Sequence, residues 1–458
     1  LIALAPARPA LWSPRLATTG TIVVPGTAMG TILRRVSRFL IRPNGRLSGS
    51  VDVHGAKNSV LKCMAACLLA PGRHRLENVP AIADVTIMSE LLSAIGLAAS
   101  HHGSGVEGVL TVEVPDEIDT VVPYEQMEAI RASIVILGPL LARTGRARIS
   151  LPGGDDFGGR PIDMHLRAFE QMGAEFITEH GYVEGICDRL KGARVVFEFP
   201  SHTATDNVMM AAVLAKGTTI IENAAREPEV ADLAGMLRGM GAQIEGDGTS
   251  RIEIEGVDSL SPAEHICVPD RVEAATFLGA VGLAGGEVFV RNARPEHMDM
   301  LLEKLRHIGV HCTPNSDGIL VSSSGTLTSV DVSTLPYPGV ATDYKPMLVT
   351  LLSAASGVAI VTENVFAGRF RYIDELRRMG ARISREGHHV VVRGVPRLSG
   401  TTVQATDIRA GAALVTAGLV ADGTTEVGGA EHVDRGYENL AGRLKALGAD
   451  IERIQSEE

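Results

Sequence analysis

A repeated pattern of glycines constrains the fold of this chain more than any other feature. Six times an apolar, alanine-rich segment ends at a glycine, a short strand follows, and an amphipathic segment closes on a hydrophobe-Gly pair. Glycine just past a helix favours a left-handed cap, so each unit predicts helix, strand, helix, strand, strand, which is β-α-β-α-β-β when permuted. The opening glycines are Gly72, Gly145, Gly217, Gly286, Gly357 and Gly423, and the closing ones are Gly96, Gly173, Gly241, Gly309, Gly380 and Gly448.

The segment before each opening glycine is apolar on nearly all sides, as in KNSVLKCMAACLLA (57–70) and IRAGAALVTAGLV (408–420). Helices of this kind belong in a protein interior, where Ala and Gly let backbones approach closely. Six such units predict two globular halves of three units each, with buried helices and sheets outside; an elongated solenoid is the alternative. The 50 glycines and the 4% of aromatic residues fit cores of this kind.

Composition narrows the function. The formal charge of −11 over 458 residues provides no basic excess for a nucleic-acid backbone, so we expect no nucleic acid as a partner. No run approaches 18 apolar residues, so we expect no membrane span. The five cysteines are scattered and odd in number, which favours reduced thiols in a cytoplasmic protein. Residues 1–35 differ in composition from the rest, and we expect a disordered extension there.

Charged residues stand near the start of each predicted buried helix. Acids there have a plain interpretation as caps, because they interact well with the helix dipole. Cations oppose that dipole and indicate an anion beside them. An acidic chain with such cations predicts a cleft for an anionic, phosphorylated small molecule. The residues are Lys57, Arg131, Asp206, Glu273, Asp343 and, in the last unit, Asp407 with Arg409.

Two further clusters are candidates for chemistry. The segment 151–161 (LPGGDDFGGRP) places glycines around Asp155, Asp156 and Arg160, which is typical of a mobile lid or of a plain surface loop. Arginines in FAGRFRY, TDIRAG and HVDRGYE could form bidentate contacts to carboxylate and phosphate, or a solvated ion-pair face.

In order and spacing, a set of motifs resembles the bacterial UDP-N-acetylglucosamine enolpyruvyl transferase family from about residue 38 to the C-terminus. Two of them, GTTIIENAAREPE and RPIDMH, separate that family from the shikimate-phosphate enolpyruvyl transferases. The motifs are GAKN at 55–58, RASI at 131–134, LPGG…GGRPIDMH from 151 to 165, GTTIIENAAREPE at 217–229, PDRVE at 269–273, TD at 342–343 and DRGYE at 434–438.

The resemblance implies an α/β fold of two inside-out barrels, each of three β-α-β-α-β-β units. The first would span 57–268, the second would combine 36–56 with 269–458, and the active site would lie in the cleft between them. The implied reaction transfers the enolpyruvyl group of phosphoenolpyruvate to the 3′-hydroxyl of UDP-N-acetylglucosamine and releases phosphate. It is the first committed step of peptidoglycan synthesis, and it needs no metal and no cofactor.

The resemblance also implies roles for single residues. Lys57 and Asn58 match the phosphoenolpyruvate-binding pair, and Asp343 matches the base that takes the hydroxyl proton. Arg160 and Arg435 match the phosphate and carboxylate ligands, supported by Arg369 and Arg409. The implied nucleotide-sugar site comprises Arg131, Arg160, Pro161, Ile162, Asp163, Met164, Ser201, Asp343 and Val365, and the implied catalytic set comprises Asp155, Asp343, Lys57 and Arg435.

The chain departs from the family pattern at three places. Asp155 stands in the lid where a cysteine is usual, so it could donate a proton only if burial and Asp156 raised its pKa to about 7. The lost thiol predicts resistance to fosfomycin, which alkylates that cysteine. His202 and Thr203 replace small residues beside the nucleotide, and Lys62 and Lys345 are unusual beside key residues. Such changes leave open an enolpyruvyl transferase for another uridine nucleotide in secondary metabolism, or a non-catalytic paralogue.

Overall fold

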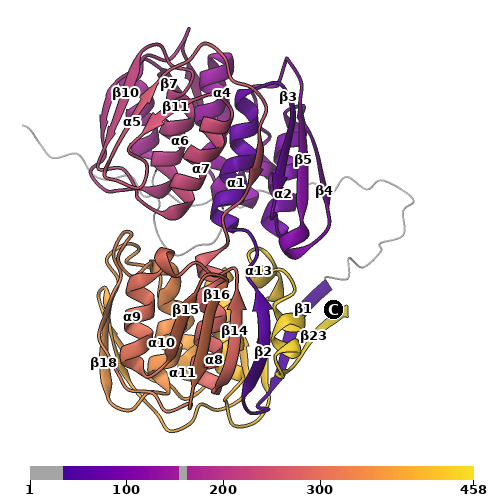
Figure 1. Ribbon diagram of the computed structural model, residues 1–458, viewed down its shortest axis with the longest axis vertical. Coiled ribbons are helices and arrows are strands. Elements are labelled where there is room, and N and C mark those ends of the chain that lie inside the picture. The colour runs from indigo at the N-terminus through magenta and orange to yellow at the C-terminus, as the bar shows by residue number, and fades with distance from the viewer. Residues whose placement is uncertain (1–34, 154–161, 458) are drawn as a thin grey trace, which may run out of the picture.

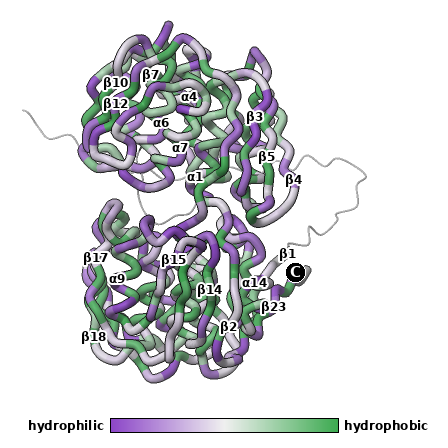
Figure 2. Tube along the Cα trace, viewed as in Figure 1, coloured by the Kyte–Doolittle hydropathy of each residue, from purple (hydrophilic) through white to green (hydrophobic). Residues whose placement is uncertain are grey.

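The computed structural model describes residues 35–153 and 162–457, which form two lobes joined by two chain crossings (Figure 1). The expected extension, apart from Arg35, and the lid residues 154–161 lie outside the described residues. Buried apolar residues form two separate clusters, one within 60–267 and the other within 39–53 and 272–451. The hydropathy colouring in Figure 2 shows apolar segments running through both lobes. Within the described ranges, no helix is long and apolar enough to cross a membrane.

The first lobe holds three sheets, with strand orders β13-β3-β5-β4, β6-β8-β7 and β11-β12-β10-β9. The strands are β3 (Gly72–Glu77), β4 (Ala98–His102), β5 (Val109–Val114), β6 (Arg146–Ser150), β7 (Glu175–Glu179), β8 (Tyr182–Ile186), β9 (Arg194–Val196), β10 (Thr218–Glu222), β11 (Gln243–Glu245), β12 (Arg251–Glu255) and β13 (Glu264–Ile266). The helices are α1 (Lys57–Ala66), η1 (Cys67–Leu69), α2 (Ala83–Ala94), η2 (Gly105–Glu107), α3 (Tyr124–Ala129), η3 (Arg131–Ile136), α4 (Leu137–Thr144), α5 (Asp163–Gln171), α6 (His202–Ala212) and α7 (Pro228–Gly239).

The second lobe holds sheets of order β21-β22-β1-β23, β15-β16-β14-β2 and β17-β18-β20-β19. The strands are β1 (Arg35–Arg42), β2 (Leu47–Asp52), β14 (Gly286–Arg291), β15 (His311–Asn315), β16 (Gly318–Ser323), β17 (Val332–Ser333), β18 (Val358–Thr362), β19 (Arg382–Glu386), β20 (His389–Arg393), β21 (Thr402–Gln404), β22 (Thr425–Gly428) and β23 (Asp450–Glu457). The helices are α8 (Arg271–Ala284), η4 (Pro295–His297), α9 (Asp299–Ile308), η5 (Thr342–Tyr344), α10 (Lys345–Ser353), α11 (Tyr372–Arg378), α12 (Ile408–Gly418), α13 (Ala430–Asp434) and α14 (Leu440–Ala446).

The sheets repeat one pairing scheme. The strand that opens a unit runs parallel to one neighbour and antiparallel to the other, as β14 does with β2 and β16. The N-terminal strands β1 and β2 complete this scheme in the second lobe, since β1 pairs with both β22 and β23. The chain therefore enters through the second lobe, crosses to build the first, and returns (Figure 1).

The glycine repeat is confirmed by the backbone. All six opening and all six closing glycines have positive φ, a region that side chains other than glycine rarely adopt. Gly286 shows the further reason, because a Cβ there would lie 1.9 Å from the carbonyl oxygen of Leu47 on the paired strand. The repeat thus marks the places where the chain turns closely between a helix and a strand.

The predicted inside-out arrangement is also confirmed. Every residue of α12 is buried, and so is all of α8 except its last residue, Ala284. The strands alternate between buried and exposed positions, as β12 does, so each sheet covers the helices with one face. One expectation about helix starts is wrong: α6 begins at His202 and is capped by Ser201, which places Asp206 in its second turn.

Candidate active site

A cavity of about 450 Å³ lies between the lobes, with walls from both. It is lined by α1, η3 and α6 of the first lobe and by η5, α12 and the loop after β18 of the second. Ten predicted site residues line it together: Lys57, Asn58, Arg131, Met164, Ser201, Asp343, Val365, Arg369, Arg409 and Arg435. Ile162 and Asp163 are not among the lining residues, while Asp155, Arg160 and Pro161 lie outside the described residues.

One buried carboxylate joins cations from the two lobes. Asp84, in the first turn of α2 and 1% exposed, accepts from Lys57 Nζ and from Arg435 Nε, each at 2.8 Å. Lys57 is the first residue of α1, and Arg435 follows α13. Lys57, Asp84 and Arg435 together carry one net positive charge beside the N-terminus of α1. Such a charge is suited to an anionic group.

Asp343 stands on the opposite wall, within η5, and forms an ion pair with Arg369. Burial alone would raise the pKa of Asp343, but the charges of Arg369 and Arg409 hold it well below its usual range. The carboxylate is therefore ionised at neutral pH and able to accept a proton. The affinity of Asp343 for a proton stays low as long as the positive charges of Arg369 and Arg409 lie beside it.

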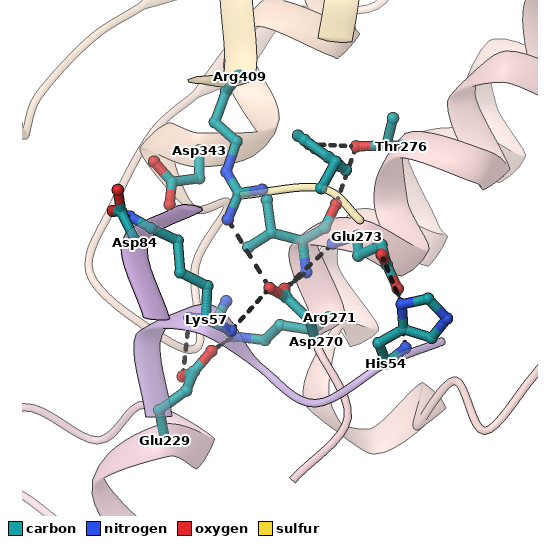
Figure 3. Close-up of polar contacts among 12 residues, drawn as sticks. His54, Lys57, Asp84, Glu229, Asp270, Arg271, Glu273, Thr276, Asp343 and Arg409 are labelled. Carbon is teal, nitrogen blue, oxygen red and sulfur yellow. Dashed lines mark hydrogen bonds and ion pairs between the residues drawn. The ribbon is translucent and has the colours of Figure 1, made fainter. Parts of the chain in front are cut away.

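The two arginines are themselves fixed by carboxylates, and Figure 3 shows the contact between Arg409 and Asp270. Arg369 lies 3.8 Å from Asp407, and Arg409 lies 3.9 Å from Asp270. Arg409 also packs over the ring of Tyr437, 5.0 Å from its centroid. Because Asp270 and Asp407 cap α8 and α12, the arginines are positioned by the same residues that start the buried helices.

Some of the residues that match the nucleotide-sugar site line the cavity, and others do not. Arg131 reaches the loop before the lid, where its Nη1 donates to the carbonyl of Pro152 at 3.0 Å. Ser201 and Val365 line the cavity from opposite lobes. By contrast, Asp163 forms an ion pair with Arg167 at 3.4 Å on α5 and does not reach the cavity wall.

A second ion cluster lines the first-lobe wall. Lys62 Nζ lies 3.2 Å from Asp206 and 3.0 Å from Nε2 of His202. Burial, against the attraction of Lys62, raises the pKa of Asp206 to about 7. Burial and the charge of Lys62 hold the pKa of His202 well below its usual range, so the ring is neutral and accepts from Lys62. The i, i+4 spacing of His202 and Asp206 was the available signal for this cluster.

Other residues at the site were missed by the sequence reasoning. Nothing in the sequence pointed to Asp84. Arg271 lines the cavity and binds Glu229 through two contacts of 3.0 and 3.3 Å, with Nε and Nη2 as donors (Figure 3). Arg271 lies in the motif PDRVE and Glu229 lies in GTTIIENAAREPE. Both motifs contributed to the resemblance, but the sequence did not place either residue in the cleft.

Lys345 supports the wall that carries Asp343. It is fully buried, its Nζ lies 2.7 Å from Glu363, and burial lowers its pKa to about 8. Glu363 in turn accepts from the hydroxyl of Thr342 and from the backbone N–H of Val365, each at 2.8 Å. The buried ion pair of Lys345 and Glu363 thus connects the segment that carries Asp343 with the segment that carries Val365.

Two lobes of repeated units with a cationic cleft between them are the architecture of a carboxyvinyltransferase. Residues 41–444 match the family model described as EPSP synthase (3-phosphoshikimate 1-carboxyvinyltransferase). The crystal structure of the enolpyruvyl transferase NikO from Streptomyces tendae superposes with a TM-score of 0.83 at 26% identity, covering 92% of this chain and 100% of that one.

Curated relatives narrow the family further. UDP-N-acetylglucosamine 1-carboxyvinyltransferase 2 of Carboxydothermus hydrogenoformans is 48% identical over 421 residues, which cover 92% of this chain and 100% of the relative. The UDP-N-acetylglucosamine 1-carboxyvinyltransferase of Corynebacterium efficiens is 48% identical over 417 residues, covering 91% and 98%. The chain belongs to the UDP-N-acetylglucosamine 1-carboxyvinyltransferase family.

Proposed function

We propose that this chain transfers the enolpyruvyl group of phosphoenolpyruvate to the 3′-hydroxyl of UDP-N-acetylglucosamine, releasing phosphate, in the first committed step of peptidoglycan synthesis. The observation that carries the proposal is the convergence of Lys57, Arg409 and Arg435 with Asp343 in one cavity between the lobes. Cations on several sides suit a substrate with phosphate and carboxylate groups, and a single carboxylate suits the removal of one proton.

In this mechanism Lys57, Asn58 and Arg435 bind phosphoenolpyruvate, with Arg369 and Arg409 in support. Anions bound to these cations offset the charge that now lowers the pKa of Asp343, so its basicity rises when the substrates are in place. Asp343 then accepts the proton of the 3′-hydroxyl as the oxygen attacks C2 of the enolpyruvyl group. C3 takes a proton from Asp155 and later loses one as phosphate leaves, which restores the double bond.

The remaining assignments belong to the same proposal. Arg131, Met164, Ser201 and Val365 contact the nucleotide sugar, joined by residues 160–163 when the lid meets the substrate. The domains divide at residues 57 and 268, a division supported by the two separate apolar cores. The reduced, largely buried cysteines support a cytoplasmic location.

One assay tests the acceptor. Purified protein is given phosphoenolpyruvate with UDP-N-acetylglucosamine, uridine monophosphate or shikimate 3-phosphate in separate reactions, and phosphate release is measured. We expect release with the first only. Release with none of the three contradicts the proposal and supports a binding protein.

A specific observation favours one second candidate, an enolpyruvyl transferase for another uridine nucleotide. Lys62 and His202 line the cavity, and both depart from the residues that the resemblance leads one to expect there; Lys62 also forms an ion pair with Asp206 at 3.2 Å. Activity with uridine monophosphate alone supports this candidate. A Lys62→Ala, His202→Gly variant that gains activity with UDP-N-acetylglucosamine also supports it.

The acid at position 155 predicts the response to fosfomycin. A carboxylate is not alkylated as a thiolate is, so we expect the protein to keep its activity after incubation with the drug. An Asp155→Cys variant should be inactivated with time, which residual-activity measurements and intact mass detect. Inactivation of the unmodified protein at the same rate contradicts this expectation.

A further inference from the structure

Three metal-ligating side chains converge inside the first lobe, outside the proposed catalytic cavity. They are Cys63 on α1, Asp232 on α7 and His265 on β13, and one ligand atom of each lies within 4.8 Å of the others. None of the three is among the described residues that line the catalytic cavity. The cluster is therefore a separate feature of the lobe.

Hydrogen bonds fix the position of each group. His265 Nε2 lies 3.0 Å from Asp232 Oδ1, and the backbone N–H of Val268 donates to Asp232 Oδ2 at 3.2 Å. The hydroxyl of Ser59 also donates to Asp232, and its oxygen lies 3.8 Å from Cys63 Sγ. Little rearrangement is needed to direct the three ligand atoms at a common point.

A fourth ligand is available from the same strand segment. Cys267 stands two residues after His265, and alternate residues of an extended segment face the same side. Cys267 is 1% exposed, so its side chain is buried within the same lobe. Its sulfur is not one of the three ligand atoms that lie within 4.8 Å of one another, so the Cys267 side chain would have to turn toward them to bind the same ion.

We propose that Cys63, Asp232 and His265 bind one Zn²⁺ ion, with the Cys267 thiol as the fourth ligand once its side chain turns toward the ion. Cysteine, histidine and aspartate are the ligands that zinc takes in tetrahedral sites, at about 2.0–2.3 Å, which places neighbouring ligand atoms about 3.3–3.8 Å apart. The 3.0 Å between His265 and Asp232 needs a small expansion, and the outer limit of 4.8 Å needs a contraction of about 1 Å. The soft sulfur ligands disfavour magnesium and calcium.

The burial of Cys63 favours ion binding over a role as a reactive thiol. The Cys63 side chain is fully buried, so a substrate cannot approach its sulfur. The side chains of His265 and Asp232 keep 16% and 10% of their surface exposed, which provides an entry path for an ion. A small cation therefore fits the cluster better than a covalent reaction does.

The site lies where the chain crosses between the lobes. The N–H of Ala56 donates to the carbonyl of Val268 at 2.7 Å, and Gly55 bridges Pro269, so the two crossings are paired directly beside the cluster. An ion bound by His265 and Cys267 would restrain one crossing, and through Cys63 it would restrain α1, which carries Lys57.

Cobalt titration tests the site directly. The untagged full chain, reduced with a non-thiol reductant and stripped with a chelator, is titrated with Co²⁺. We expect one equivalent to produce a thiolate-to-cobalt charge-transfer band in the near ultraviolet and the intense visible bands of a tetrahedral site. Zn²⁺ should bleach both and raise the Tm of the protein.

Matched variants decide the ligands. Cys63→Ser and His265→Asn should each abolish the charge-transfer band and the zinc-dependent rise in Tm, with folding checked by far-ultraviolet circular dichroism. Cys312→Ser, which changes a half-buried cysteine on β15 of the other lobe, should keep both signals. If Cys63→Ser does not fold, His265→Asn and Asp232→Asn decide the question.

The proposal is overturned if stoichiometric cobalt gives no thiolate band while all five thiols titrate as free. It is also overturned if the band survives both Cys63→Ser and His265→Asn. Neither result depends on enolpyruvyl transfer, since the readouts are spectroscopic and thermal, so this proposal and the proposed function fail separately.

Discussion

The buried helices of the two lobes start differently, although the same repeat builds them. In the second lobe, Asp270 and Asp407 cap α8 and α12 by accepting backbone N–H groups. In the first lobe, the residues that precede α1 and η3 provide no capping side chain, although Asp270 of the second lobe accepts the N–H of Lys57 at 3.2 Å, and each helix begins with a cation, Lys57 or Arg131. Among the described buried helices of that lobe, α6 is capped by a neutral residue, Ser201.

This difference in capping affects how the cations of the cleft are positioned. The capping acids of the second lobe also lie 3.8 Å from Arg369 and 3.9 Å from Arg409, so carboxylates of the same lobe position these two arginines. In the first lobe cations begin α1 and η3 instead, and Asp84 binds both Lys57 and, across the cleft, Arg435. We infer that both lobes supply the cations that receive an anion, and that the capping acids of the second lobe fix the positions of Arg369 and Arg409.

Replacing Asp343 by alanine should have the largest effect. The second-lobe wall would keep its arginines but lose its proton acceptor, so kcat should fall by about 10²- to 10⁴-fold, the usual contribution of a general base. Steady-state phosphate release measures it. The control is Asp374→Ala, which removes an exposed acid of α11, and full activity of Asp343→Ala would refute its role.

Replacing Asp84 by asparagine tests the link between the lobes. The loss of a buried charge that holds Lys57 and Arg435 should raise KM for phosphoenolpyruvate about 10- to 100-fold, since breaking such pairs is costly. KM for the nucleotide sugar should change less. Glu90→Gln, an exposed change on the same helix, serves as the matched control, and equal shifts in the two KM values would contradict the assignment.

Replacing Asp407 by asparagine separates capping from charge. Asparagine still accepts the N–H groups of α12, but Arg369 loses a buried carboxylate 3.8 Å away, so the free energy of unfolding should fall by about 2 kcal/mol. Ser201→Ala in the first lobe removes a neutral cap alone and should cost about 1 kcal/mol. Urea denaturation measures both, and a larger loss for Ser201→Ala would break the contrast between the lobes.

Replacing Asp206 by asparagine should have the smallest effect, seen as a change in pH dependence. Burial raises the pKa of Asp206 from its ordinary value of 3.8 to about 7, so between these pH values the native state holds a proton there that the unfolded state has lost. Its contribution to stability is full below pH 4 and declines as the pH rises to 7.

The unfolding free energy of the unmodified protein, relative to that of Asp206→Asn, should therefore fall between pH 4 and 7. Denaturation series across this range measure the difference. A difference that grows with pH would show that the Lys62 ion pair, rather than burial, governs this carboxylate.

Much of the fold could be predicted because it depends on local rules. Glycine at positive φ and helices apolar on all sides are visible in the sequence, and both recur in the structure at the expected positions. The cations at the cleft were also found, since a cation at a helix N-terminus is unusual enough to indicate a ligand. The interpretation of Asp206 as a cap was wrong because Ser201, a neutral residue five positions earlier, caps α6 instead.

The residues that support the site could not be predicted in this way. Asp84 is a common acid in the first turn of an amphipathic helix, and only the docking of the second lobe brings Arg435 to it. Lys345 and Glu363 are eighteen positions apart, on a helix and after a strand, and their pairing depends on how those elements pack.

By itself the sequence determined the repeat, the inside-out lobes and the cations of the cleft, because backbone conformation and helix polarity follow from neighbouring residues. Only the tertiary structure decided which charges meet. An ion pair such as Lys57–Asp84–Arg435, or the cluster of Cys63, Asp232 and His265, joins residues distant in the chain. Their distances, and the burial that sets their pKa values, exist only after the elements have packed.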